Sequence, residues 1–158
     1  MVQGTRLKTF SITVDIDAPP DAVWAVMSDV EKWHEWTASI TSVERLDAGP
    51  FVVGSRAHVR QPKLRPADFV VTELVPQREF TWVTRSPGIG ATARHAVEPI
   101  ARGTRATLSV RFEGLLSGPV AWMFGTLTDQ YLALEAAGLK KRTEERQRAS
   151  TVRSARVN

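Results

Sequence analysis

The segment FSITVDIDAPPDAVWAVM, residues 10–27, places a strand, a turn and a helix in direct succession. Apolar and polar residues alternate from Phe10 to Ile16, which is the period of a strand with one buried face. The run Ala18-Pro19-Pro20-Asp21 then ends the strand and begins a helix, because proline fits the first helical turn and an early acid complements the helix dipole. Val23, Trp24 and Met27 share one side of this helix, so the segment predicts a short helix through Met27 packed against a sheet.

A second short helix is predicted over Asp29–Trp36. Trp33 and Trp36 lie three residues apart there, which brings them near one face of a helix. Large aromatic side chains in this position either plug an edge of the core or line an opening into it.

The chain beyond Trp36 is predicted to form strands separated by turns. Six strands are expected, at Ile40–Leu46, Gly54–Gln61, Asp68–Val75, Phe80–Arg85, Ala91–Pro99 and Thr104–Gly114. Turn-like clusters separate nearly all of them at short intervals. These connections favour an antiparallel meander, since a parallel crossover needs a dozen or more residues.

The last predicted element is a long helix from about Val120 to about Arg146. Its apolar stripe recurs three and four residues apart, at Val120, Phe124, Leu127, Tyr131, Leu134 and Gly138. This stripe is expected to face the sheet. One strand, two short helices, six strands and a covering helix together predict an α+β fold.

Length and composition predict a single domain. The chain has 158 residues, of which 42% are apolar, and these are enough to build a core without disulfides or structural metals. We assign residues 1–146 to this domain and residues 147–158 to a basic, flexible C-terminal tail. Cysteine is absent, which excludes disulfides, thiolate metal sites and cysteine nucleophiles.

The positive charge is concentrated at the C-terminal end. The net charge is +4, but the segment Lys140–Asn158 has seven basic and two acidic residues, which leaves −1 for the rest of the chain. A near-neutral body lacks the clustered basic face of nucleic-acid-binding folds, so no nucleic-acid partner is expected. The basic segment is interpreted as a solvated helix end and tail, with peripheral contact to anionic membrane headgroups as the alternative.

No segment predicts export or membrane insertion. Residues Met1–Arg6 have no apolar stretch behind their charges, and no apolar run approaches the roughly 20 residues that span a bilayer. We expect a cytoplasmic protein that exists as a monomer or a homodimer.

The sequence contains no motif for a metal site or a cofactor. His34, His58 and His95 are far apart, and His34-Glu35 lacks the second histidine of a zincin helix. No serine lies in G-x-S-x-G, and no glycine-rich loop has the lysine or acid that nucleotide binding requires. We therefore expect neither a metal nor a cofactor, and hydrolase, kinase and dehydrogenase activities have no support.

Several motifs, in this order and spacing, resemble the polyketide cyclase/dehydrase branch of the START-like, or Bet v 1-like, helix-grip superfamily. They are Ile16–Trp24, then D-x-x-x-W-x-x-W at Asp29–Trp36, G-S-R-A-H-V-R-Q-P at Gly54–Pro62, Val71-Thr72-Glu73, Phe80-Thr81-Trp82, His95–Pro99, and Gly103-Thr104-Arg105 leading into Arg111–Gly114. The resemblance covers roughly Phe10 to Arg142. It implies a curved seven-stranded antiparallel sheet wrapped around the C-terminal helix, two short helices after the first strand, and a cavity that binds lipids, sterols, polyketides or aromatic metabolites.

Strand alternation then selects candidate side chains for the cavity. The predicted ligand-binding residues are Trp36, Val59, Gln61, Trp82, His95, Val97, Val110, Phe124, Leu127 and Tyr131. Each apolar member is equally consistent with ordinary core packing. Gln61 is positioned to hydrogen-bond a ligand carbonyl, whereas Glu73 receives no role because both faces of its strand are apolar.

His95 and Tyr131 are the candidate catalytic residues. An imidazole on an apolar face can transfer protons near neutral pH, although a lone histidine there is also consistent with a hydrogen-bonded core residue. A cyclase needs a proton donor and an acceptor within reach of one substrate, so the cavity would have to bring the two residues together.

Two main functions follow from these observations. The first is a binding or carrier module for an apolar metabolite, which we favour. The alternative is a polyketide cyclase/aromatase or dehydratase-like enzyme that uses His95 and Tyr131. A third hypothesis is lipid delivery at membranes through the basic tail. The fold alone does not choose among them.

Overall fold

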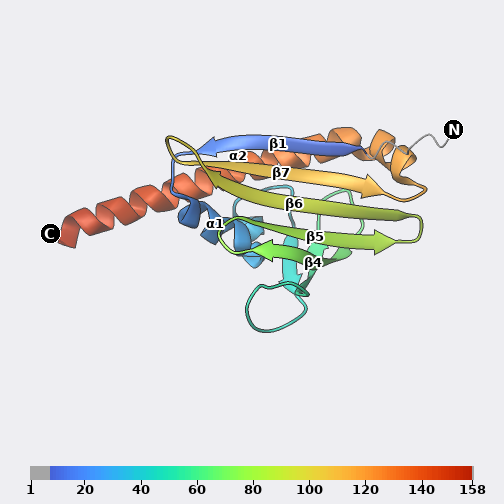
Figure 1. Cartoon of the computed structure of the whole chain (residues 1–158), viewed down its shortest axis with the longest axis horizontal. Coiled ribbons are helices and arrows are strands. Elements are labelled where there is room, and N and C mark those ends of the chain that lie inside the picture. The colour runs from blue at the N-terminus through green and yellow to red at the C-terminus, as the bar shows by residue number, and fades with distance from the viewer. Residues whose placement is uncertain (1–7, 158) are drawn as a thin grey trace.

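Seven strands form one antiparallel sheet that lies across a long C-terminal helix (Figure 1). The structure, a computed structural model, describes residues 8–157. The elements in chain order are β1 (Thr9–Ile16), α1 (Pro20–Ser28), the 3-10 helix η1 (Val30–Glu35), β2 (Ser42–Arg45), β3 (Arg56–Arg60), β4 (Ala67–Val75), β5 (Glu79–Ser86), β6 (Ile89–Pro99), β7 (Thr104–Glu113) and α2 (Ser117–Val157). The prediction about Met1–Arg6 lies outside the described residues.

The sheet order is β1-β7-β6-β5-β4-β3-β2, with every neighbouring pair antiparallel. The consecutive strands β2 to β7 form the predicted meander, and β1 then adds to β7, with Phe10 opposite Val110 and Ile16 opposite Thr104. Every predicted strand is present, with ends within two residues of the prediction. The α+β helix-grip fold is thereby confirmed.

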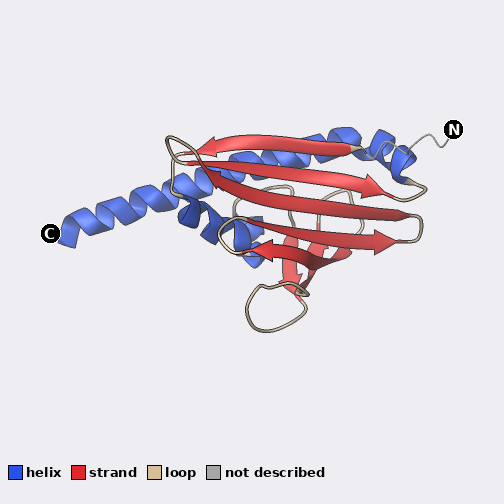
Figure 2. Cartoon of the chain, viewed as in Figure 1, coloured by secondary structure: helices blue, strands red, loops and turns tan. Residues whose placement is uncertain are grey.

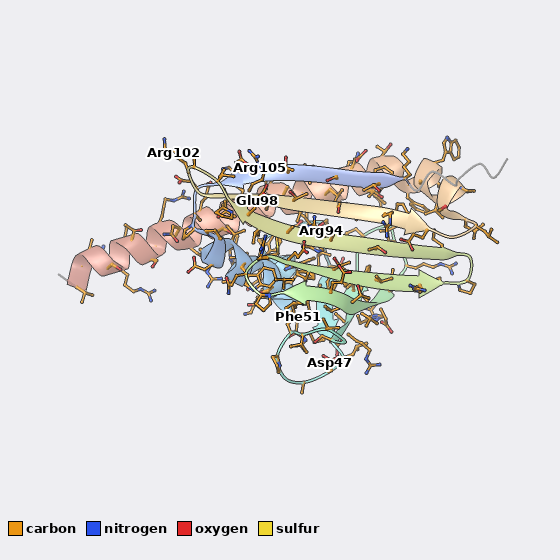
Figure 3. All side chains as sticks on the ribbon, viewed as in Figure 1. Asp47, Phe51, Arg94, Glu98, Arg102 and Arg105 are labelled. Carbon is orange, nitrogen blue, oxygen red and sulfur yellow. The ribbon has the colours of Figure 1, made fainter. Side chains whose placement is uncertain are left out.

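The helices α1, η1 and α2 lie on the same side of the sheet (Figure 2). α2 packs against β1 and β7, and α1 packs against β6 and α2. The inner face of the sheet is therefore covered, and residues such as Phe80, Trp82 and Leu108 on it are buried. The opposite, outer face carries charged side chains, among them Arg94, Glu98 and Arg105 (Figure 3).

α2 is longer than the sequence predicts at both ends. It begins at Ser117 rather than Val120 and continues to Val157, so the residues up to 157 that were assigned to a flexible tail are helical. The predicted end near Arg146 is wrong because no glycine or proline follows Gly138 to stop the helix. This C-terminal part extends past the sheet in Figure 1.

The buried stripe of α2 also differs from the prediction after Tyr131. Leu134, which was expected to face the sheet, is 43% exposed, whereas Leu132 and Glu135 are buried. A step of three residues from Tyr131 reaches Leu134 and a step of four reaches Glu135. Hydrophobicity predicted that Leu134 would face the sheet, but the helix places Glu135 on that side.

Candidate ligand-binding cavity

A cavity of about 590 Å³ lies between the inner face of the sheet and α2. Small-molecule sites usually have volumes of 300–1,000 Å³, so this space suits a ligand of one to a few rings. Strands β3 to β7 supply one wall, and α2 supplies the other through a stripe from Val120 to Glu135. Most of the lining is apolar, with a few polar side chains among it.

An aromatic cluster at the inner side of the cavity surrounds His95, which belongs to β6 and is 4% exposed. Its ring stacks on Phe80 with centroids 4.6 Å apart, and the centroids of Trp33 and Trp82 lie 5.0 and 5.9 Å away. The Nδ1 atom of His95 is buried and has no hydrogen-bond partner. Burial lowers the pKa of His95 to about 3, so the imidazole is neutral at pH 7.

Glu135 brings a carboxyl group into the same cavity from α2. The residue is 8% exposed, and burial raises its pKa from 4.5 to about 8. Among residues 8–157 no cation offsets the cost of ionising it, so the group is mainly the neutral carboxylic acid at pH 7. The cavity therefore holds a carboxylic acid able to donate a proton and a neutral imidazole able to accept a hydrogen bond. Glu135 was not among the site residues predicted from the sequence.

Exposed residues of the loop between β3 and β4 form one edge of the cavity. Lys63 and Arg65 line the cavity and are exposed at this loop. The Tyr131 hydroxyl donates a hydrogen bond to the Pro62 carbonyl, which fastens α2 to the loop. Gln61 already donates its amide to the Ser39 carbonyl at 3.2 Å, which leaves its side-chain oxygen as a free acceptor.

Eight of the ten predicted ligand-binding residues line this cavity: Val59, Gln61, Trp82, His95, Val110, Phe124, Leu127 and Tyr131. Trp36 does not, because it lies against Gly138 of α2, and the neighbouring Trp33 lines the cavity instead. Val97 is buried on the inner face beyond His95, outside the cavity lining, at the end of β6 where α1 covers the sheet.

The predicted pair of His95 and Tyr131 shares the cavity, but the two side chains differ in their surroundings. Tyr131 is partly exposed beside the loop between β3 and β4, and its hydroxyl donates its hydrogen to the Pro62 carbonyl. Burial raises its pKa. Glu135 follows Tyr131 by one turn of α2, about 6 Å along the axis, and is more deeply buried. Glu135 is therefore a more suitable proton donor than Tyr131.

The outer face contains a second hollow, of about 440 Å³, lined mainly by polar and charged residues. Arg94 is paired there with Glu79, and Arg105 with Asp15 at 2.8 Å. These ion pairs are solvent-exposed, and none of their side-chain atoms is a buried polar atom without a hydrogen-bond partner. The inner cavity is therefore the candidate functional site.

Residues 8–157 contain neither a cluster of metal ligands nor a helix that could span a membrane. No group of three or more histidine, aspartate or glutamate residues there is arranged to hold a metal ion. Over the same residues, no helix is both long and apolar enough to cross a membrane.

A bent antiparallel sheet around a C-terminal helix, with a cavity between them, defines the START-like helix-grip class. Residues 8–144 match the sequence model of the family described as "Polyketide cyclase / dehydrase and lipid transport", and the chain belongs to this family. No curated protein matches the chain.

Three solved structures illustrate the similarity in fold. The Zhui aromatase/cyclase from Streptomyces is 17% identical, with 92% of this chain and 98% of that chain covered at a TM-score of 0.75. A START superfamily protein from Mycobacterium smegmatis is 16% identical, with 85% and 97% covered and a TM-score of 0.68. A protein from Thermus thermophilus is 15% identical, with 87% and 98% covered and a TM-score of 0.70. At these identities the comparison establishes the fold and not the activity.

Proposed function

We propose that the chain binds an apolar small molecule, such as a lipid, polyketide or aromatic metabolite, between the sheet and α2. The observation that carries this proposal is the 590 Å³ cavity, which is mostly apolar and contains the two buried polar groups of His95 and Glu135. Buried apolar area provides affinity at about 25 cal/mol per Å². The imidazole and the carboxylic acid are both neutral at pH 7, so they favour a ligand with a hydroxyl or carbonyl group over a charged one.

The proposal is tested by titrating the protein with 1-naphthol and following the quenching of tryptophan fluorescence, since Trp33 and Trp82 line the cavity. Ala93→Phe places a large side chain inside the cavity and is expected to weaken binding at least tenfold. Ala96→Phe is the matched control, because Ala96 lies on the same strand but lines the outer hollow. Equal affinity of the wild type and Ala93→Phe would show that naphthol binds elsewhere.

A second candidate function is dehydration of a β-hydroxy carbonyl compound, as in polyketide ring closure. The specific observation that favours it is the presence of a neutral carboxylic acid and a neutral imidazole in one mostly apolar cavity. The imidazole of His95 would take a proton from the carbon next to the carbonyl, and Glu135 would give its proton to the hydroxyl, which leaves as water. The new carbon–carbon double bond completes the step, and proton return from imidazolium to carboxylate restores both residues.

This activity is measurable with 4-hydroxy-4-phenylbutan-2-one, whose dehydration product absorbs in the near ultraviolet. Proton transfer by a positioned side chain contributes about 10²–10⁴-fold, so Glu135→Gln and His95→Phe are each expected to lower kcat at least 100-fold. Ala96→Phe controls for folding. Turnover that is unchanged in His95→Phe would exclude His95, and a wild type without turnover would leave the binding function alone.

A further inference from the structure

Four large apolar side chains are exposed together where β7 joins α2. Leu115 is 94% exposed, Trp122 85%, Met123 66% and Leu116 48%, and we call these four residues the apolar tip. The segment 114–128 around them contains no charged residue. Single exposed apolar residues are ordinary, but a contiguous group that includes a tryptophan usually marks an interaction surface.

The backbone holds the apolar tip in place. The Leu116 amide donates a hydrogen bond to the Gly88 carbonyl at 2.9 Å, which ties the start of α2 to the turn between β5 and β6. Gly114 supplies the sharp change of direction with φ of 102°. The Val120 amide donates to the Leu116 carbonyl at 3.0 Å and begins the regular helix. The exposed side chains thus project from a turn that is fixed by backbone hydrogen bonds and from the first turns of α2.

The apolar tip borders the cavity. Val120 and Phe124 line the cavity, and the exposed Trp122 and Met123 lie between them on α2. Ile89, which follows the turn that holds Leu116, lines the cavity as well. A surface that covered the tip would therefore lie next to one end of the cavity. The basic end of α2 lies at the opposite end of the molecule (Figure 1).

The charges around the apolar tip are positive. Among residues 8–10, 85–90 and 110–124, Lys8 and Arg85 are exposed cations, and the remaining charges, Arg111 and Glu113, form an ion pair at 2.6 Å. This end of the described chain therefore has two cations that no carboxylate offsets. An anionic surface complements it.

The size of the apolar tip also distinguishes between partners. Four large side chains exposed to this degree present roughly 500 Å² of apolar surface, taking about 150–250 Å² for a full aromatic side chain. A stable protein–protein interface buries about 800 Å² on each partner, so the tip is small for a permanent dimer. Tryptophan beside basic residues is instead typical of proteins that lie on a bilayer surface.

We propose that the apolar tip docks on an anionic lipid bilayer, with Trp122 and Leu115 inserted among the lipids and Lys8 and Arg85 at the headgroups. Docking brings the neighbouring end of the cavity to the membrane, where a poorly water-soluble ligand is concentrated. The transfer of a ligand between the membrane and the cavity rests on the proposed function, but docking itself needs no ligand.

The test is sedimentation of the full chain with vesicles of phosphatidylcholine containing phosphatidylglycerol, and with vesicles of phosphatidylcholine alone. The wild type is expected to bind the anionic vesicles more tightly. Leu115→Ser/Trp122→Ser is expected to lower the affinity at least 30-fold, and Lys8→Gln and Arg85→Gln about fivefold each. Val157→Ser, which changes a side chain 82% exposed at the other end of α2, is the matched control and should bind as the wild type does.

Three outcomes would overturn the proposal. The first is a wild type that does not sediment with anionic vesicles, and the second is a double variant that sediments as the wild type does. The third is a wild type that forms a dimer in analytical ultracentrifugation without binding vesicles, while the double variant is a monomer. The naphthol titration is run on the same samples. Naphthol binding without vesicle binding refutes the docking alone, and vesicle binding without naphthol binding refutes the proposed function alone.

Discussion

Replacing Glu135 with glutamine is expected to remove a pH dependence of stability that the buried carboxyl group causes. In the folded protein burial raises the pKa of Glu135 to about 8, whereas its ordinary value is 4.5. Between these values the folded state holds a proton that the unfolded state has lost. The free energy of unfolding therefore falls as the pH rises, at up to about 1.4 kcal/mol per pH unit.

Between pH 5 and pH 8 the wild type is expected to lose about 3–4 kcal/mol of stability relative to Glu135→Gln. Glutamine keeps the size and hydrogen-bonding capacity of the side chain, so the two proteins differ mainly in this titration. His95 also affects the pH profile, but it does so in both proteins and cancels in the comparison. Urea unfolding at four pH values measures the difference directly.

Glu145→Gln controls for the loss of a carboxyl group from the same helix, since Glu145 is exposed. Stability curves of the wild type and Glu135→Gln that ran parallel, within about 0.5 kcal/mol, from pH 5 to pH 8 would contradict a raised pKa of Glu135. Parallel curves would mean that Glu135 is solvated or paired in the folded protein, and the cavity would then lack its neutral acid.

Other substitutions test the packing around the cavity. A side chain at Gly138 would place its Cβ 2.0 Å from the Trp36 carbonyl oxygen, so Gly138→Ala should destabilise the protein by about 1–3 kcal/mol in urea unfolding, while Gly118→Ala, with open space around it, should be neutral or stabilising. Phe80→Ala should cost about 3–5 kcal/mol in the same assay, because Phe80 is fully buried. Because burial lowers the pKa of His95 to about 3, the wild type loses stability as the pH falls below 6.5, and His95→Phe should resist acid unfolding by about 4 kcal/mol more at pH 3. A loss of less than 0.5 kcal/mol in Gly138→Ala or Phe80→Ala, or the same acid midpoint in His95→Phe, would contradict these expectations.

The sheet was predictable because its strands alternate cleanly and its turns are short. Val59 and Trp82 were placed on the inner face by period alone, and both are there. Glu73 is the exception, since the register of β4 against β5 shifts between Val71 and Glu73. Such an irregularity breaks the period of two, so alternation could not assign the face of Glu73.

The residues of the site were harder to predict where the three-dimensional packing, and not the period of the sequence, determines which side chain reaches the cavity. Trp33 and Trp36 are the same residue type and lie on the same predicted helix, so the sequence does not distinguish them. Trp36 packs on Gly138, and it is Trp33 that reaches the cavity. Glu135 lies four residues after Tyr131, which was a usable signal. A charged residue is nevertheless seldom assigned to a buried stripe, because its burial is costly unless it is neutralised.

The cavity as a binding site is tested most directly by a crystal structure of the protein grown with 1-naphthol. We predict electron density for the naphthol between β6 and α2, with its hydroxyl within hydrogen-bond distance of Glu135 or of the His95 imidazole. A cavity filled by rearranged side chains, or naphthol bound only on the outer face, would contradict it.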